Sequence, residues 1–207
     1  MRVKIPTLFI IHSALFILLL SGCFNEPEPA YKSVPAEARV YLSDRGLKDL
    51  STVRDSLKAG AAIDYLNLDR NELETLPTEI AALEGLKWLR LNDNRLSELP
   101  ALDQLRNLRR IYLRGNRFTA VPEALKNLPS LTDIDLSQNQ IAEVPAWLAE
   151  KRGLENLSFS GTRITSLPED LSAWAPTLIS LQLGDLRLSK AEMARIRKAL
   201  PKTRVVY

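Results

Sequence analysis

The chain has 207 residues, 45% of them hydrophobic and 26% charged, with a formal net charge of +3. This length and hydrophobic content suffice for one domain with a sizeable core, and they exclude an intrinsically disordered chain. A charge this small gives no argument for nucleic-acid binding, and we expect none.

The first 22 residues have the features of a secretory signal peptide. Arg2 and Lys4 form a positively charged start, and residues 5–20 are mostly apolar. This apolar stretch is too short and too weakly flanked for a convincing membrane-spanning helix. We therefore predict that residues 1–22 direct export and are then removed. The only histidine, His12, is lost with them, and 26 basic and 25 acidic side chains remain.

The next feature is the segment Leu-Ser-Gly-Cys at residues 20–23, which resembles the lipobox of bacterial lipoproteins at all four positions. The resemblance implies that Cys23 becomes the first mature residue, with a diacylglycerol thioether and an acylated amine. Several acyl chains anchor a protein stably, whereas a single chain is marginal. The alternative is a free buried thiol after an ordinary signal peptide.

The lipobox resemblance implies a location in the bacterial cell envelope, attached to a membrane by lipid. Phe24, rather than Asp, follows the cysteine. In a Gram-negative organism this favours the outer membrane. Cys23 is the only cysteine, so no disulfide can form within the chain.

Two segments separate the cysteine from the rest of the chain. Residues 23–35 contain three prolines and no apolar period, which predicts a semi-extended tether of at most ~40 Å. Residues 36–62 are predicted to form a helical N-terminal cap. Its apolar stripe, at spacings of three and four, comprises Leu47, Leu50, Val53 and Leu57.

An internal repeat occupies residues 63–188. Its blocks are 22 to 24 residues apart, and five share the form LxxLxLxxNxLxxLPxx, with Thr162 in place of the fifth asparagine. The pattern resembles the leucine-rich repeat family. The resemblance implies an α/β solenoid, with a curved parallel sheet and a short helical or irregular return side. The blocks begin at Ile63, Leu86, Leu108, Leu131, Leu154 and Leu178.

The chemistry of one block agrees with this resemblance. The apolar residues Leu89 and Leu91 alternate with Trp88 and Arg90. This period of two indicates a strand with one face turned inward. Such a strand cannot bury its leucines alone, so the blocks must stack. We expect each repeated asparagine to bond buried backbone groups of neighbouring coils, a role that Thr162 fills only in part.

The last segment, residues 189–207, is predicted to form a cap of one helix and one strand. Ser189 and Glu192 have the spacing of a capping box, which starts a helix. Residues 187–207 carry a net charge of +6. Anionic lipid could attract this charge, but a solvated helix with cations near its C-terminus is the favoured interpretation.

The mature chain lacks the groups of several common enzyme classes. Without histidine or a free thiol, Ser-His-Asp and Cys-His arrangements are excluded, and no phosphate loop or His/Cys metal cluster occurs. Asp133 and Asp135 lie on one strand about 7 Å apart, a separation that a glycosidase could use. The favoured interpretation is that both are exposed positions of the fourth repeat, with Asp133 kept ionised by Arg110 beside it, and we expect no enzyme, cofactor or metal.

A binding surface on the concave sheet is the favoured function. Aromatic and arginine side chains gather on its N-terminal half, as in binding hot spots, and we expect a monomer that binds a protein partner there. The alternatives are a glycan or peptidoglycan binder, a passive envelope protein, and an ordinary solvated face. The predicted partner-binding residues are Tyr65, Trp88, Arg90, Arg110, Tyr112, Arg114, Asp133 and Asp135.

Overall fold

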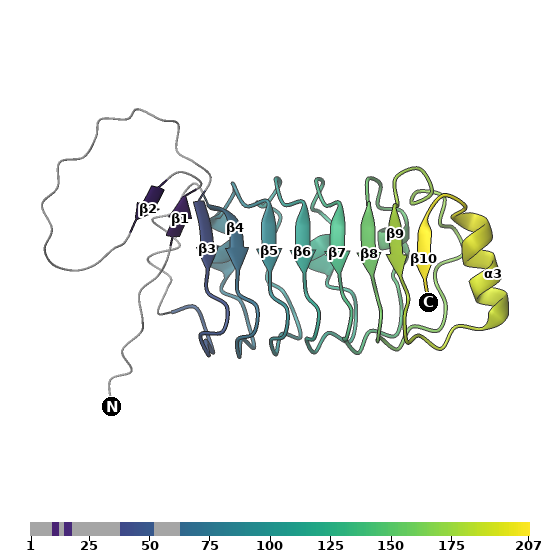
Figure 1. Ribbon diagram of the computed structural model, residues 1–207, viewed down its shortest axis with the longest axis horizontal. Helices are drawn as coiled ribbons and strands as arrows, with labels where there is room; N and C mark the ends of the chain where they lie inside the picture. Colours follow the sequence, from purple (N-terminus) through teal and green to yellow (C-terminus); the bar gives the residue numbers. More distant parts are fainter. Residues whose placement is uncertain (1–9, 13–14, 18–37, 52–62) are drawn as a thin grey trace, which may run out of the picture.

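The computed structural model describes residues 10–12, 15–17, 38–51 and 63–207. They form one sheet of ten strands in the order β10-β9-β8-β7-β6-β5-β4-β3-β1-β2 (Figure 1). Each neighbouring pair from β3 to β10 is parallel, which confirms the predicted leucine-rich repeat sheet. These strands are β3 (Ala38–Tyr41), β4 (Ile63–Asn67), β5 (Trp88–Arg90), β6 (Arg110–Tyr112), β7 (Asp133–Asp135), β8 (Asn156–Ser158), β9 (Ser180–Gln182) and β10 (Arg204–Val206).

The strand register places equivalent residues of successive coils side by side. Trp88 lies between Tyr65 and Arg110, and Arg90 lies between Asn67 and Tyr112. The same register continues through β7, β8 and β9. The side chains at these positions therefore form rows along one surface of the sheet. We call this surface the outward face of the sheet; it corresponds to the predicted concave face.

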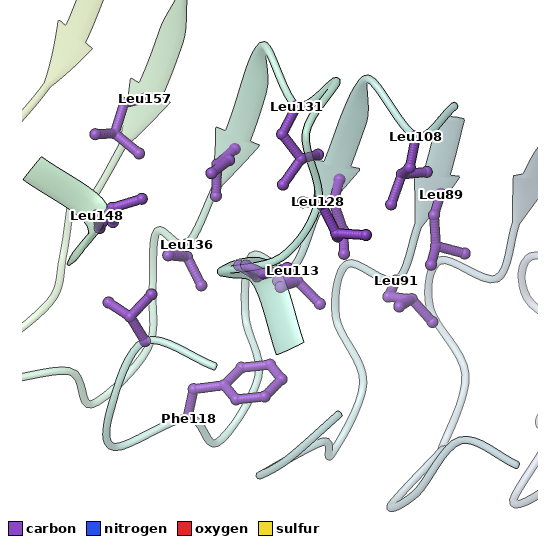
Figure 2. Close-up of a cluster of buried hydrophobic side chains, with 14 of the residues drawn as sticks. Leu89, Leu91, Leu108, Leu113, Phe118, Leu128, Leu131, Leu136, Leu148 and Leu157 are labelled. Carbon is purple, nitrogen blue, oxygen red and sulfur yellow. The ribbon is translucent and has the colours of Figure 1, made fainter. Parts of the chain in front are cut away.

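The opposite face of the sheet packs on a leucine core. Leu91, Leu113 and Leu136 repeat from coil to coil, each fully buried, as Figure 2 shows. The return side contributes Leu148, also fully buried, from a short helix. This side is helical or irregular, as predicted. Its helices are η1 (Thr78–Ala82), η2 (Glu123–Leu125) and α2 (Ala146–Ala149).

The repeated asparagines form a ladder along the edge where the strands end. The Asn116 amide donates to the carbonyls of Leu91 and Leu113, in two different coils, and accepts from the Leu96 amide. Asn71, Asn94 and Asn139 make the equivalent bonds. Each buried asparagine thus satisfies backbone groups that have no strand partner, as the sequence predicts.

The ladder stops at Thr162, in the fifth block. Thr162 is 9% exposed, and its Oγ1 has no hydrogen-bond partner among the described residues. The prediction that this hydroxyl partly replaces an asparagine is therefore wrong. The threonine side chain is one bond too short to reach the backbone groups that the asparagine amides reach.

The predicted N-terminal helix over residues 36–62 is wrong for residues 38–51. These residues form β3 and a turn. Asn71 accepts hydrogen bonds from the amides of Arg45 and Leu47, and the bond from Leu47 matches the one that Asn94 accepts from Leu73. The segment is a degenerate coil, with Arg45 in the asparagine position. Its apolar residues stand 26 positions before those of the next coil: Val40, Leu42, Leu47 and Leu50.

At the other end, helix α3 (Lys190–Ala199) follows Ser189, whose side chain accepts from the Glu192 amide as the capping box predicts. β10, the expected last strand, pairs with β9. Two hydrogen bonds join α3 to the fifth coil. Glu192 accepts one from the Leu167 amide, and Arg195 donates the other to the Leu167 carbonyl. Hydrogen bonds from Arg195 lower the pKa of Glu192 below its usual value.

The predicted leader and anchor lie mostly outside the described residues. β1 (Ile10–His12) pairs with β2 (Leu15–Ile17) and with β3, both antiparallel. Both strands fall within the predicted signal peptide, which stays a prediction. Cys23 and the tether at 23–35 are outside the described residues, as are residues 52–62 of the predicted cap. No helix in the described part of the chain is long and apolar enough to cross a membrane.

The ladder gives a pair of opposite predictions for stability. Asn116→Ala leaves three buried backbone groups without their side-chain partner: the amide of Leu96 and the carbonyls of Leu91 and Leu113. We therefore expect the free energy of unfolding to fall by about 3 kcal/mol. Thr162→Asn supplies the missing amide, so we expect a gain of about 1 kcal/mol. Urea unfolding followed by circular dichroism measures both. A destabilised Thr162→Asn variant would contradict the account of the ladder.

Candidate binding surface

Three aromatic rings lie in a row on the first strands of the outward face. The Tyr41 and Tyr65 ring centroids are 5.2 Å apart, and those of Tyr65 and Trp88 are 5.7 Å apart at an interplanar angle of 64°. Edge-to-face contacts of this kind are the favoured geometry for aromatic pairs. Each ring is half-buried by its neighbours, and burial raises the pKa of Tyr65.

Two arginines stack on the rings of adjacent strands. The guanidinium carbon of Arg110 is 4.6 Å from the Trp88 ring centroid, and that of Arg90 is 5.2 Å from the Tyr112 centroid. These are cation–π distances. We call Tyr65, Trp88, Arg90, Arg110 and Tyr112 the aromatic–arginine cluster. The structure thus brings together five of the eight predicted partner-binding residues.

Asp69 fixes the position of Arg90 in the cluster through a partly buried hydrogen bond. It is 2% exposed, and its Oδ2 accepts from Arg90 Nε at 2.7 Å while its Oδ1 accepts from the Asn92 amide at 2.7 Å. Burial by itself lowers the pKa of Arg90. The hydrogen bonding and charge of Asp69 act in the opposite direction and outweigh burial, so the pKa of Arg90 lies above its usual value. Arg90 is therefore a fixed charge in a fixed position.

The two predicted carboxylates of β7 differ from each other. Asp133 was expected to be exposed but is buried at 7% exposure, because it accepts from Thr132 and Asn156 and lies 3.6 Å from Arg110. Asp135 is half-buried and accepts from Ser137 through one oxygen only. Asp133 is thus a supporting residue for Arg110, whereas Asp135 faces outward.

Arg114, the last of the predicted residues, lies beyond the strand end and outside the cluster. Its side chain is exposed, and its backbone amide donates to Asn92. Two members of the site were missed from the sequence. Tyr41 lies in the segment that was predicted to be a helix. The leucine spacing of that segment could have revealed a coil and so placed Tyr41 beside Tyr65. Asp69 lies just after β4, but periodicity gives no sign that it bonds Arg90.

The described surface contains several hollows. A hollow of about 250 Å³ lies on the outward face beside Tyr112, and a larger one of about 490 Å³ lies at the turn around Thr162. Within the described ranges, no group of three or more His, Cys, Asp or Glu is placed to hold a metal. The aromatic–arginine cluster therefore defines the candidate site, since it combines rigid rings with fixed charges.

Comparison with known proteins agrees with the repeat. A leucine-rich repeat family model matches residues 61–118 and again residues 106–164. The chain belongs to the leucine-rich repeat family. Podocan-like protein 1 of Homo sapiens is 30% identical over 167 residues, which are 80% of this chain and 28% of that protein. Keratocan of Bos taurus is 29% identical over 107 residues, 49% of this chain and 29% of that protein.

Other matches fall in proteins of different kinds. The alpha subunit of geranylgeranyl transferase type-2 of Bos taurus is 36% identical over 97 residues, which are 46% of this chain and 17% of that subunit. The solved structure of the Leptospira interrogans LRR protein LIC12759 matches with a TM-score of 0.37 and 25% identity, covering 81% of this chain and 59% of that one. The chain spans less than a third of the length of each of these curated relatives.

The Asp69–Arg90 pair gives a prediction with a matched control. Asp69→Asn replaces the buried carboxylate by an amide, and we expect a loss of about 2 kcal/mol because a charged hydrogen bond is removed. Asp44→Asn removes a similar pair with Arg70, whose two side chains are 55% and 59% exposed. That change should cost much less, because water screens the charges of an exposed pair. Equal losses, measured by urea unfolding, would contradict the role given to burial.

Proposed function

We propose that this chain is a membrane-anchored bacterial lipoprotein that binds a protein partner through the outward face of its sheet. The aromatic–arginine cluster carries this proposal. Tyr, Trp and Arg are the side chains enriched in binding hot spots. Here stacking and the Asp69 bonds hold them before any partner arrives. Less side-chain entropy is then lost on association.

A protein partner fits the cluster better than a sugar. Arg110 covers one face of the Trp88 ring, which leaves less of the flat ring surface on which a sugar would stack. Guanidinium groups suit the carboxylates and carbonyls of a polypeptide. We therefore propose a non-catalytic recognition role, and binding to purified cell wall remains the outcome that would favour a glycan ligand.

In the sequence, the proposed anchor precedes the strands that carry the cluster. Cys23 precedes β3 by 15 residues, and β4, β5 and β6 follow β3 directly in the sheet. A tether over residues 23–35 would then hold the aromatic–arginine cluster in the half of the solenoid nearest the lipid. We propose a location in the cell envelope, on the outer membrane if the organism is Gram-negative.

The first test is capture of a partner from a detergent extract of the native envelope. Trp88→Ala and Tyr112→Ala remove half-buried rings of the outward face without touching the leucine core, so we expect folding to persist and capture to fall at least tenfold. Trp147→Ala is the control. Trp147 is also half-buried but lies on the return side, in α2, so its loss should leave capture unchanged. Capture by Trp88→Ala equal to that of the native protein would refute the proposal.

The second test addresses the anchor. Cys23→Ser removes the thiol that would carry the diacylglycerol, so we expect the protein to move from the membrane pellet to the soluble fraction and to lose fatty-acid label. Cell fractionation and mass spectrometry of the N-terminal peptide measure this. An unmodified Cys23 in the mature native protein would contradict lipidation, but it would leave the binding surface untouched.

A further inference from the structure

The outward face has a second feature beside the aromatic–arginine cluster. A hollow of about 250 Å³ opens between Tyr112 and the strands β7, β8 and β9. Its volume is below the usual range for small-molecule sites, about 300–1,000 Å³. The hollow is thus suited to one side chain of a larger molecule. Its walls include Asp135, Asn156, Ser158 and Gln182.

The two amide side chains that line this hollow leave their oxygens free as acceptors. One amide N–H of Asn156 is used on Asp133, and one of Gln182 is used on Ser180. The side-chain oxygens of Asn156 and Gln182 accept no hydrogen bond from any described residue. The second N–H of each amide is also free, so the amides can pair with a donor or an acceptor, and the charge of the hollow decides between the two.

The charge of the hollow is also unbalanced. Of the outward-row carboxylates, Asp69 is paired with Arg90 and Asp133 lies near Arg110. Asp135 has no basic side chain within 4.0 Å in the described part of the chain, and only its Oδ1 is bonded, to the amide and hydroxyl of Ser137. Its Oδ2 is left for a donor that the protein does not supply.

We infer that this hollow binds the ammonium group of a lysine side chain on the protein partner. An ammonium has three donors and no acceptor, and it is a compact charge, which matches one free carboxylate oxygen with scattered carbonyl oxygens. The ring of Tyr112 forms one wall and offers a cation–π contact. This inference rests on the proposed protein-binding function and names one residue type that the partner must carry.

The test uses n-butylammonium as a probe for the lysine side chain, with butyrate at equal ionic strength as its anionic counterpart. Amide shifts in ¹H–¹⁵N spectra report where each binds. We expect n-butylammonium to shift the amides of 133–135, 156–158 and 180–182, and butyrate to leave them unchanged. Asp135→Asn should weaken n-butylammonium binding at least fivefold, while Asp103→Asn, an exposed carboxylate outside the hollow, should not.

Two results would overturn the inference. The first is equal n-butylammonium binding by the native protein and Asp135→Asn, and the second is an absence of shifts at the hollow. Neither result bears on capture through Trp88, which depends on the aromatic–arginine cluster. Conversely, capture that is insensitive to Trp88→Ala refutes the proposed function even where the amine binds. The two experiments therefore fail separately.

Discussion

The in-register stacking of coils is the constraint on which the rest of this structure depends. A short strand of three residues cannot bury its leucines by itself, so each coil needs its neighbours. The asparagine at each strand end then fixes the register, because one amide bonds carbonyls of two successive coils, as Asn116 does with Leu91 and Leu113. Loss of one such amide leaves several buried backbone groups unpaired at once.

Stacking also determines how the outward face is built. Once Trp88 stands beside Arg110, and Arg90 beside Tyr112, strand spacing brings each guanidinium over a ring. Neighbouring strands lie about 4.8 Å apart, which is close to the cation–π distance. The face is therefore preorganised by the same repeat that builds the core. The residues that vary between coils decide the chemistry of this face. Strands β4 to β6 carry the rings and arginines, and strands β7 to β9 carry Asp135 and the free acceptors.

Much of this could be predicted from the sequence because the repeat has a nearly constant period. A period of 22 to 24 residues sets the parallel register, so the neighbours of Trp88 on both sides follow from counting. Where the period is irregular, the prediction is wrong. Leu47 and Leu50 fit a helical stripe and also the positions of a degenerate coil. The pairing of β3 with β4 and the hydrogen bonds that Asn71 accepts identify the coil. The burial of Asp133 depends on contacts from three residues, which a period of two cannot show.

We propose that recognition lies in the non-repeating side chains of the outward face. Hydroxyl-radical footprinting of the native protein, in its own envelope and after purification, tests it most directly. Trp88, Tyr65 and Tyr112 are half-buried oxidation targets on this face, and Trp147 is a similar target on the return side. The account predicts lower oxidation of the first three in the envelope, with Trp147 unchanged. Protection of Trp147 without protection of Trp88 would contradict it.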